Sequence, residues 1–338
     1  MPKAICGVDC KKAQLRDIEI GPMQEWDVKV VLEASAISVG TESYVMSTHS
    51  KEKGLYVPGY APVARIVAVG AKAAEAGYRA GERISYFMPQ AAKGVWQSCG
   101  GHQGTALVSV NPAGRDMLGS DCYVVRVPEG LSSERAAFAG ISAVSDQGVS
   151  LSRPNVGDKA LAIGQGLIGQ FAAAHLHLRG AEVMVADVHD KRLAIAKAWG
   201  ADHAINVKGK DLAGAVREIW PGGADIIADS TGNYQAIEQS VGAMKWRDGK
   251  YVLLAWCKGP FNLPCFHNRV FEVYMPWTLQ GFRVLNAFRL MRSGALNVDA
   301  MITHRFKYTD AAAAYDMVFA APETYCGIVF DWAGQEID

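Results

Sequence analysis

The sequence has neither a long hydrophobic run nor a block of like charges. No stretch of about 18 uncharged apolar residues occurs, so we predict no membrane-spanning helix. Lys and Arg together number 34, as do Asp and Glu, and the resulting net charge of zero provides no general attraction to nucleic acid or to an anionic membrane. Met1–Asp9 lacks the apolar core of a secretion signal and instead predicts a β-strand. We therefore expect a globular protein with a small-molecule partner.

The cysteines form no C-x-x-C pair, and their number, seven, is odd. They are Cys6, Cys10, Cys99, Cys122, Cys257, Cys265 and Cys326. Scattered cysteines in odd number are typical of reduced thiols in a cytoplasmic protein rather than of a disulfide framework.

The first third of the chain alternates short apolar runs with turn residues, as β-structure does. A chain of 338 residues exceeds the size of a single core, so a second domain is expected. We predict an antiparallel, partly barrel-like β-domain. Its expected strands are Val28–Leu32, Ala64–Val69, Gly81–Ile84, Ala106–Val110 and Tyr123–Val127.

The pattern changes after Leu131, where Ser132 or Ser133 can cap a helix. Apolar runs then alternate with helical segments, a pattern that indicates a doubly wound parallel sheet. The expected strands are Ala160–Ile163, Glu182–Ala186, His203–Val207, Asp225–Asp229 and Tyr251–Leu254. A helix is expected at Gly281–Arg292, followed by a strand, a helix and a strand within His304–Trp332 that return to the first domain. The chain is thus predicted to have an α/β fold.

A complete G-x-G-x-x-G motif joins the first strand of this sheet to a helix expected at Gln170–Leu178. Its residues are Gly164, Gln165, Gly166, Leu167, Ile168 and Gly169. The first glycine permits a tight turn, the second lets the backbone approach a pyrophosphate, and the third allows close packing of helix on strand. The pyrophosphate would lie against the free N–H groups at the start of the helix. In this context the motif predicts a Rossmann domain that binds a dinucleotide, although a plain glycine turn is the alternative.

Asp187 ends the second strand, where a carboxylate can accept hydrogen bonds from the ribose hydroxyls of the cofactor. Its charge would repel a 2′-phosphate, so we favour NAD(H) over NADP(H). Lys191 and Arg192 follow closely and could soften this preference. Ser230, Thr231 and Gly232 end another strand, and we expect them beside the nicotinamide ribose, with simple turn chemistry as the alternative.

The order of these features resembles the medium-chain dehydrogenase/reductase superfamily over nearly the whole chain. Matching segments include Val57–Gly59, Gly81–Ile84, Arg126–Leu131, Gly157–Asp158, Gly200–Asp202 and Ile302–Phe306. The resemblance implies a GroES-like β-domain at residues 1–130, completed by residues 280–338, and a Rossmann domain at 131–279. It also implies a homodimer, because such enzymes pair their Rossmann sheets edge to edge near residues 251–276.

Zinc-dependent members of the superfamily carry metal ligands that this sequence lacks. The matching positions hold Val39, then Tyr60 and Ala61, then Gly140, and none of these offers an imidazole, thiolate or carboxylate. The segment expected to hold a structural zinc, residues 88–101, retains only Cys99. We therefore expect no metal. The run from Ile37 to Glu42 is similar to a zinc-free branch that includes the hydroxyethyl bacteriochlorophyllide a dehydrogenases.

Without zinc, a side chain must handle the proton that accompanies hydride transfer. The resemblance places Thr41 where a hydroxyl touches the substrate oxygen, Tyr44 near a relay position, and Tyr60 in the emptied metal site. Glu42 and His49 are further candidates. Helix capping by Thr41, space filling by Tyr60 and a surface role for His49 are the structural alternatives. Of the aromatic residues, Trp96, Trp256, Phe266 and Trp277 could line an apolar pocket, or they could belong to a core or a subunit interface.

These features predict a zinc-independent dehydrogenase that transfers a hydride between NAD(H) and a secondary alcohol or ketone. A hydroxyethyl tetrapyrrole and a sugar or polyol are the expected substrate classes. One alternative is an enone or quinone reductase, which usually prefers NADPH, and Asp187 argues against that preference. A nucleotide-binding protein without turnover is the alternative of a different class.

Overall fold

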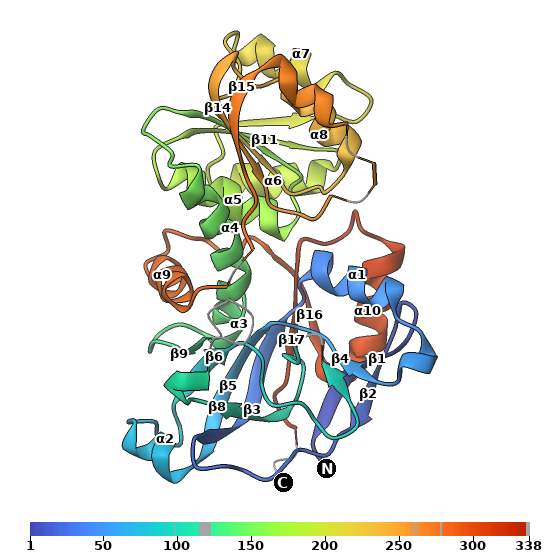
Figure 1. Cartoon of the computed structure of the whole chain (residues 1–338), viewed down its shortest axis with the longest axis vertical. Coiled ribbons are helices and arrows are strands. Elements are labelled where there is room, and N and C mark those ends of the chain that lie inside the picture. The colour runs from blue at the N-terminus through green and yellow to red at the C-terminus, as the bar shows by residue number, and fades with distance from the viewer. Residues whose placement is uncertain (98, 115–122, 258, 261, 278, 336–338) are drawn as a thin grey trace. The chain divides into compact units, whose positions relative to one another are not determined.

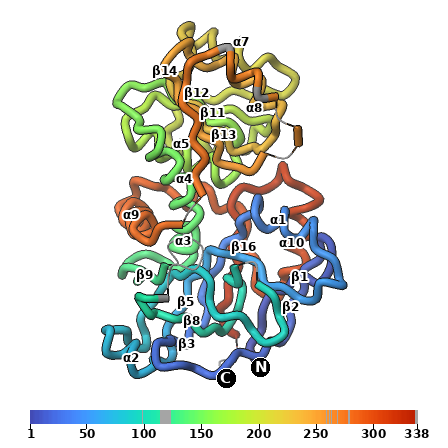
Figure 2. Tube along the Cα trace, in the orientation of Figure 1, coloured from blue at the N-terminus to red at the C-terminus, as the bar shows by residue number. Residues whose placement is uncertain are grey.

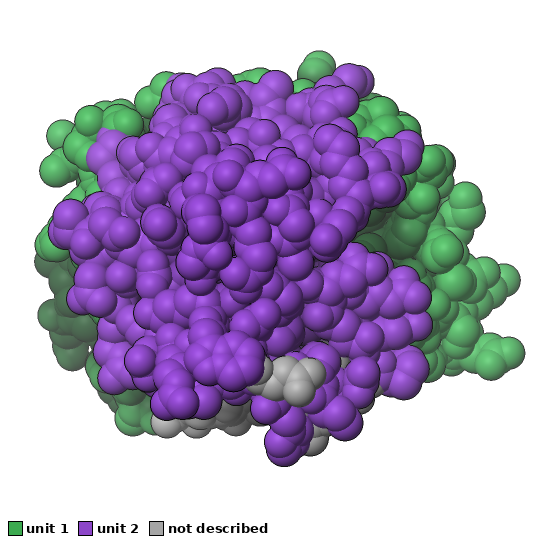
Figure 3. Space-filling view, turned by 90° about the horizontal axis from the view of Figure 1, so that it is seen from above, with its two compact units in different colours: residues 1–140, 279–294, 302–338 green, residues 141–278, 295–301 purple. Residues whose placement is uncertain are grey.

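The computed structural model describes residues 1–97, 99–114, 123–257, 259–260, 262–277 and 279–335 (Figure 1). The chain forms two compact units, which are coloured separately in Figure 3. The first comprises Met1–Gly140, Leu279–Gly294 and Ile302–Asp338, and the second comprises Ile141–Thr278 and Ala295–Met301. Within the described residues, no helix combines the length and the apolar character that a membrane crossing requires.

The second unit is built on a parallel sheet with the strand order β12-β11-β10-β13-β14-β15. Its strands are β10 (Lys159–Ile163), β11 (Glu182–Asp187), β12 (His203–Asn206), β13 (Ile226–Asp229), β14 (Arg247–Leu253) and β15 (Val270–Tyr274). The strand order reverses direction between β10 and β13, and ligands bind at this point in open sheets of the doubly wound kind.

Both faces of this sheet are covered by helices, because alternate residues of each strand enter two different cores. Ala160 and Ala162 of β10 pack with α5 and α6, whereas Leu161 and Ile163 pack with α7 and α8. The helices are α5 (Leu167–His177), α6 (Asp190–Trp199), α7 (Leu212–Ile219) and α8 (Tyr234–Val241). The predicted doubly wound sheet is therefore confirmed.

The first unit contains two sheets. In the larger one the order is β16-β17-β3-β5-β6-β9, with β8 also paired to β3, and in the smaller one it is β2-β1-β4-β7. The first-unit strands are β1 (Lys3–Asp9), β2 (Lys12–Asp17), β3 (Asp27–Ala36), β4 (Tyr56–Val57), β5 (Ala61–Val69), β6 (Arg83–Tyr86), β7 (Trp96–Gln97), β8 (Thr105–Ser109), β9 (Val124–Arg126), β16 (Ile302–Lys307) and β17 (Gly327–Asp331). Every strand predicted for this region is present.

The C-terminal segment completes the first unit. β17 pairs antiparallel with β3, so the red end of the trace lies beside the blue strand in Figure 2. Tyr315 and Phe330 from this segment share one core with Leu32 and Met46 from the first fifty residues. The remaining helices are α1 (Val39–Thr48), α2 (Ala71–Glu75), α3 (Ser133–Ala136), α4 (Ala139–Leu151), α9 (Gly281–Arg292) and α10 (Ala311–Ala320).

Two features differ from the expectations. The first unit continues to Gly140, past the predicted end at residue 130, because α3 packs on β3 and β5. Ser132 caps this helix by accepting a hydrogen bond from the N–H of Arg135. In addition, β15 was not predicted as a strand.

Candidate functional site

The glycine motif forms a tight turn between β10 and α5. Gly164 has a φ of +80°, a conformation that favours glycine. A Cβ atom on Gly169 would lie 1.7 Å from the carbonyl oxygen of Gly164, so only glycine allows the helix to approach the turn this closely. Gly166 precedes the helix without a side-chain cap, and a Cβ atom there would meet nothing within 4 Å. The turn therefore presents the start of α5 to an open position, as an anion site requires.

Asp187 lies beside this turn at the end of β11. One carboxylate oxygen accepts a hydrogen bond from the backbone N–H of Gln165 (2.5 Å), and the other accepts one from His189 (2.8 Å). A carboxylate oxygen can accept more than one hydrogen bond, so Asp187 can orient the turn and still accept from a ribose hydroxyl. Arg192 is half-buried on α6, where its backbone carbonyl accepts from Gln170.

The other side chains of the motif are engaged within the protein. The amide of Gln165 is buried and donates to the carbonyl of Ala162 (3.0 Å), and Leu167 is buried. The backbone carbonyl of Ile168 accepts from the hydroxyl of Ser145 (2.9 Å). Because Gln165 and Leu167 are buried, these two residues can serve a cofactor through their backbone only.

The segment after β13 supports the glycine turn. The hydroxyl of Ser230 donates to the carbonyl of Gly164 (2.8 Å), and the hydroxyl of Thr231 donates to the carboxylate of Asp229 (3.0 Å). Gly232 has a φ of +60°, and a Cβ atom on it would lie 2.4 Å from the carbonyl oxygen of Trp256. Burial raises the pKa of Asp229 to about 6. The two hydroxyl groups, which were expected beside the nicotinamide ribose, hold the loops of the site together.

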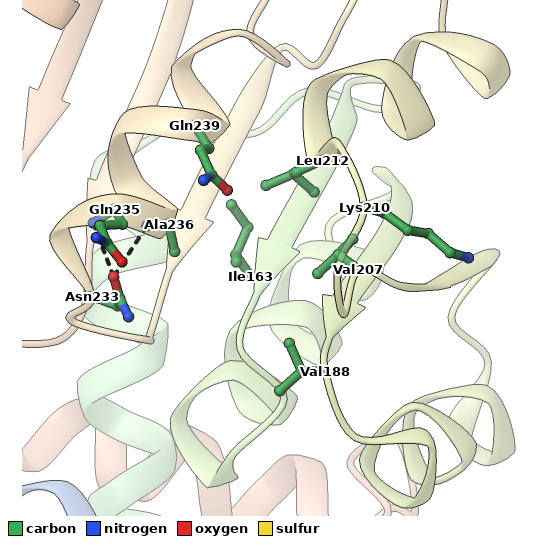
Figure 4. A pocket seen from close by; sticks show the side chains of 9 residues that line it. All are labelled: Ile163, Val188, Val207, Lys210, Leu212, Asn233, Gln235, Ala236 and Gln239. Carbon is green, nitrogen blue, oxygen red and sulfur yellow. Dashed lines mark hydrogen bonds between the residues drawn. The ribbon is translucent and has the colours of Figure 1, made fainter.

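A cavity of about 180 Å³ opens at the carboxyl end of the same strands (Figure 4). Its apolar wall includes Ile163, Val188, Val207 and Leu212, and its remaining lining residues are Lys210, Asn233, Gln235, Ala236 and Gln239. One lining residue, Val188, directly follows Asp187 in the chain. An apolar cavity with polar groups at its rim suits a flat heterocycle. None of these residues was predicted as part of the site, although Val188 and Val207 each follow the end of a strand.

In the first unit, Tyr60 and Ser38 form a buried hydroxyl pair. The Ser38 hydroxyl donates to the Tyr60 oxygen (2.8 Å), and it lies 3.5 Å from the hydroxyl of Thr41, an exposed residue of α1. Burial raises the pKa of Tyr60 well above its ordinary value, so the phenol keeps its proton at neutral pH. The structure thus brings two predicted residues, Thr41 and Tyr60, to one serine that the sequence analysis did not select.

The positions compared with zinc ligands hold groups that do not suit zinc. A Cβ atom on Gly140 would lie 2.9 Å from the hydroxyl of Tyr123, and burial raises the pKa of that tyrosine to about 12. Tyr60 is likewise a neutral phenol. Within the part of the chain that the structure describes, no three His, Cys, Asp or Glu side chains come together as a metal site. Because zinc requires imidazole, thiolate or carboxylate donors, this cluster does not fit the metal.

Glu42 does not face outward as a titrating partner of the reaction. It is 2% exposed, and its carboxylate accepts hydrogen bonds from the Ser38 backbone N–H (2.7 Å) and from the hydroxyl of Tyr315. His102 lies 3.2 Å from the same carboxylate and 2.8 Å from the hydroxyl of Ser35. The expected role of Glu42 is corrected accordingly: it anchors the start of α1 from inside the core.

His49 and Tyr44 also differ from the expected roles. His49 is buried, donates from Nε2 to the carbonyl of Gly54 (2.8 Å) and packs against Tyr56 with ring centroids 4.4 Å apart. It therefore fixes the loop that follows α1, which is a structural role. Tyr44 is 39% exposed on α1 and presents much of its ring to solvent.

Comparisons with known proteins support the resemblance. Residues 168–293 match a family model described as zinc-binding dehydrogenase. The chain is 30% identical over 211 residues to sorbitol dehydrogenase 1 of Saccharomyces cerevisiae, a match that spans 59% of this chain and 58% of the yeast protein. It is 28% identical to an L-threonine 3-dehydrogenase of an Anaeromyxobacter species, over 94% of both chains.

Solved structures agree on the fold. A 2R,3R-butanediol dehydrogenase from Bacillus subtilis superposes with a TM-score of 0.80 at 19% identity, over 98% of this chain and 99% of the other. An Escherichia coli oxidoreductase of unknown specificity gives a TM-score of 0.83 at 18% identity, with the same coverage of both chains. The matched sequences, the two-unit fold and the glycine turn are all similar to those of the medium-chain dehydrogenase/reductase superfamily.

Proposed function

We propose that this protein is an NAD(H)-dependent dehydrogenase that interconverts a secondary alcohol and its ketone. The observation that carries the proposal is the position of Asp187 beside the glycine turn, with an apolar cavity at the carboxyl ends of the same strands. The start of α5 would hold the pyrophosphate, Asp187 the ribose hydroxyls, and the cavity the adenine. The carboxylate would repel a 2′-phosphate, which favours NADH over NADPH.

We further propose that the reaction does not use zinc and that Tyr60 handles the proton. NADH, held by the start of α5 and Asp187, would supply the hydride for the carbonyl carbon. Tyr60 donates its phenolic proton to the carbonyl oxygen, a task suited to a tyrosine that burial keeps neutral. In the reverse direction Tyr60 gives up its own proton as its oxygen accepts that of the alcohol. This proposal places the chain in a zinc-free branch of the superfamily.

Two substrate classes have support. Relatives named sorbitol dehydrogenase and L-arabinitol 4-dehydrogenase favour a polyol. A hydroxyethyl group on a flat tetrapyrrole is favoured by the Ile37–Glu42 segment and by the paired indoles of Trp256 and Trp277. These rings stack with centroids 5.3 Å apart, and both residues are more than half exposed. Such a pair offers a flat apolar surface to an extended ring system.

The proposal is tested by turnover of protein that has been dialysed against a zinc chelator. We expect the dialysed protein to oxidise NADH in the presence of a ketone, with no gain when zinc is restored and with slower turnover from NADPH. Fructose and acetophenone serve as probes for the polyol and aromatic classes. Zinc-dependent activity would contradict the role of Tyr60, and a preference for NADPH would favour an enone or quinone reductase. NADH binding without turnover of any probe would favour a nucleotide-binding protein that is not an enzyme.

We propose that two copies of the chain associate through β15. This strand is the last of the second unit's sheet, and Val270, Val273 and Met275 at this edge are 58%, 43% and 72% exposed. An exposed apolar edge strand readily pairs with another strand. We expect sedimentation equilibrium to give twice the chain mass of 36.3 kDa. The variant Val273→Lys should shift the protein toward monomer, whereas Val156→Lys, at an exposed valine outside β15, should not. A monomeric wild type would overturn the proposal.

A further inference from the structure

Ser38 connects the buried phenol of Tyr60 to the protein surface. The residue is 5% exposed, and its hydroxyl lies between those of Tyr60 (2.8 Å) and Thr41 (3.5 Å). Thr41 itself is exposed. The three hydroxyl groups therefore form a path from a buried site to solvent.

The Ser38 hydroxyl has donor geometry toward both of its neighbours, the Tyr60 oxygen and the Thr41 oxygen, and its single hydrogen serves one of them at a time. When that hydrogen is donated to Tyr60, the hydrogen of Tyr60 is available to another acceptor. A ketone oxygen is such an acceptor. The pair is therefore arranged for donation to a ketone, with a second hydrogen already in position to replace the one that leaves.

We propose that Ser38 relays a proton from Thr41 to Tyr60 in the same step as ketone reduction. The inference rests on the proposed function of Tyr60. As the Tyr60 O–H bond breaks and its proton joins the carbonyl oxygen, the Tyr60 oxygen takes the proton of Ser38. In the same step Ser38 takes the proton of Thr41, and Thr41 takes one from water, which leaves one hydroxide in solvent for each alcohol formed. Alcohol oxidation runs the same transfers in reverse.

Buried contacts hold Ser38 in place for this role. Its backbone N–H donates to the Glu42 carboxylate at 2.7 Å, and Tyr315 donates a hydrogen bond to that carboxylate from α10. His102 contacts it from the segment before β8. Glu42 is thus a positioning residue: it fixes the backbone of Ser38 from the side opposite to solvent.

The test is the single-turnover rate of ketone reduction, measured with pre-bound NADH and whichever of fructose and acetophenone the wild type reduces. Ser38→Ala is expected to lower this rate about 10²-fold, the lower end of the usual contribution of a positioned proton-transfer group, and to leave NADH affinity unchanged. Ser38→Thr, which keeps a hydroxyl, should restore most of the rate. Ser43→Ala removes a neighbouring serine hydroxyl from the same helix and serves as the matched control.

A second readout separates relay from packing. The wild-type rate should depend on the D2O fraction along a curve, because more than one proton moves, and Ser38→Ala should make that dependence linear. If Ser38→Ala reduced the ketone at the wild-type rate while Tyr60→Phe was impaired, the relay proposal would be overturned and the proposed role of Tyr60 would stand. A linear dependence of the wild-type rate on the D2O fraction would lead to the same conclusion. Failure of the wild type to reduce either ketone would remove the proposed function and the relay together.

Discussion

Replacing Tyr60 with Phe is expected to slow ketone reduction by about 10²–10⁴-fold while NADH binds as before. The substitution removes the proposed proton donor and little else, because Phe fills nearly the same volume. The cofactor residues lie in the second unit, so their affinity for NADH should not change. The measurement is a stopped-flow single turnover, combined with a fluorescence titration of NADH.

Tyr86→Phe provides the matched control. Tyr86 is also a fully buried tyrosine of the first unit, and its hydroxyl has no hydrogen-bond partner among the described residues. Its removal should therefore leave both the rate and the fold intact. If Tyr60→Phe reduced a ketone as fast as the wild type, the proton would come from another group.

Gly166→Ala and Gly169→Ala are both expected to weaken NADH binding, but only Gly169→Ala is expected to destabilise the fold. At Gly169 the new Cβ atom would meet the carbonyl oxygen of Gly164 at 1.7 Å, so the helix must move away from the turn. We expect a loss of about 3 kcal/mol in the free energy of unfolding, measured by urea denaturation, together with loss of NADH binding. At Gly166 a Cβ atom meets nothing in the protein, so stability should hold.

The Gly166→Ala variant isolates the cofactor contact. Its methyl group would occupy the open position at the start of α5, where the pyrophosphate is proposed to bind. We expect the Kd for NADH to rise by about 10- to 100-fold, which corresponds to the usual cost of inserting a methyl group into a close contact. An unchanged Kd in this stable variant would show that the nucleotide does not bind at the glycine turn.

The nucleotide-binding unit could be predicted in detail because its signals are local. β10 and β11 are short apolar runs, and the glycines between them follow backbone rules that act over six residues. The conformations of Gly164 and Gly169 are those that the motif requires. In contrast, β15 is an apolar segment whose residues are exposed or half-buried, and its place in the sheet depends on pairing with β14.

The polar cluster of the first unit could not be predicted, because its contacts join distant parts of the chain. Glu42 and Tyr315 are 273 residues apart in sequence, yet they share a hydrogen bond. The hydrogen bond from Tyr315 holds the Glu42 side chain in the core. From the sequence, Glu42 was instead predicted to take part in proton transfer during the reaction. His102 and Ser35 are similarly brought together only by the folded sheet. For Ser38, the relevant signal was available: it lies three residues before Thr41 at the start of the same helix.

The return of the chain to the first unit affects the order in which the protein can form as it leaves the ribosome. All strands of the second unit's sheet, β10 to β15, are synthesised before β16 begins. The larger sheet of the first unit cannot be completed until β17 has been synthesised, because β17 lies between β16 and β3 in that sheet. Glu42 lacks Tyr315 until α10 emerges, and β3 lacks one of its neighbours until β17 follows. The nucleotide-binding sheet can therefore close first, and the buried contacts that anchor Ser38 are among the last that the chain can make.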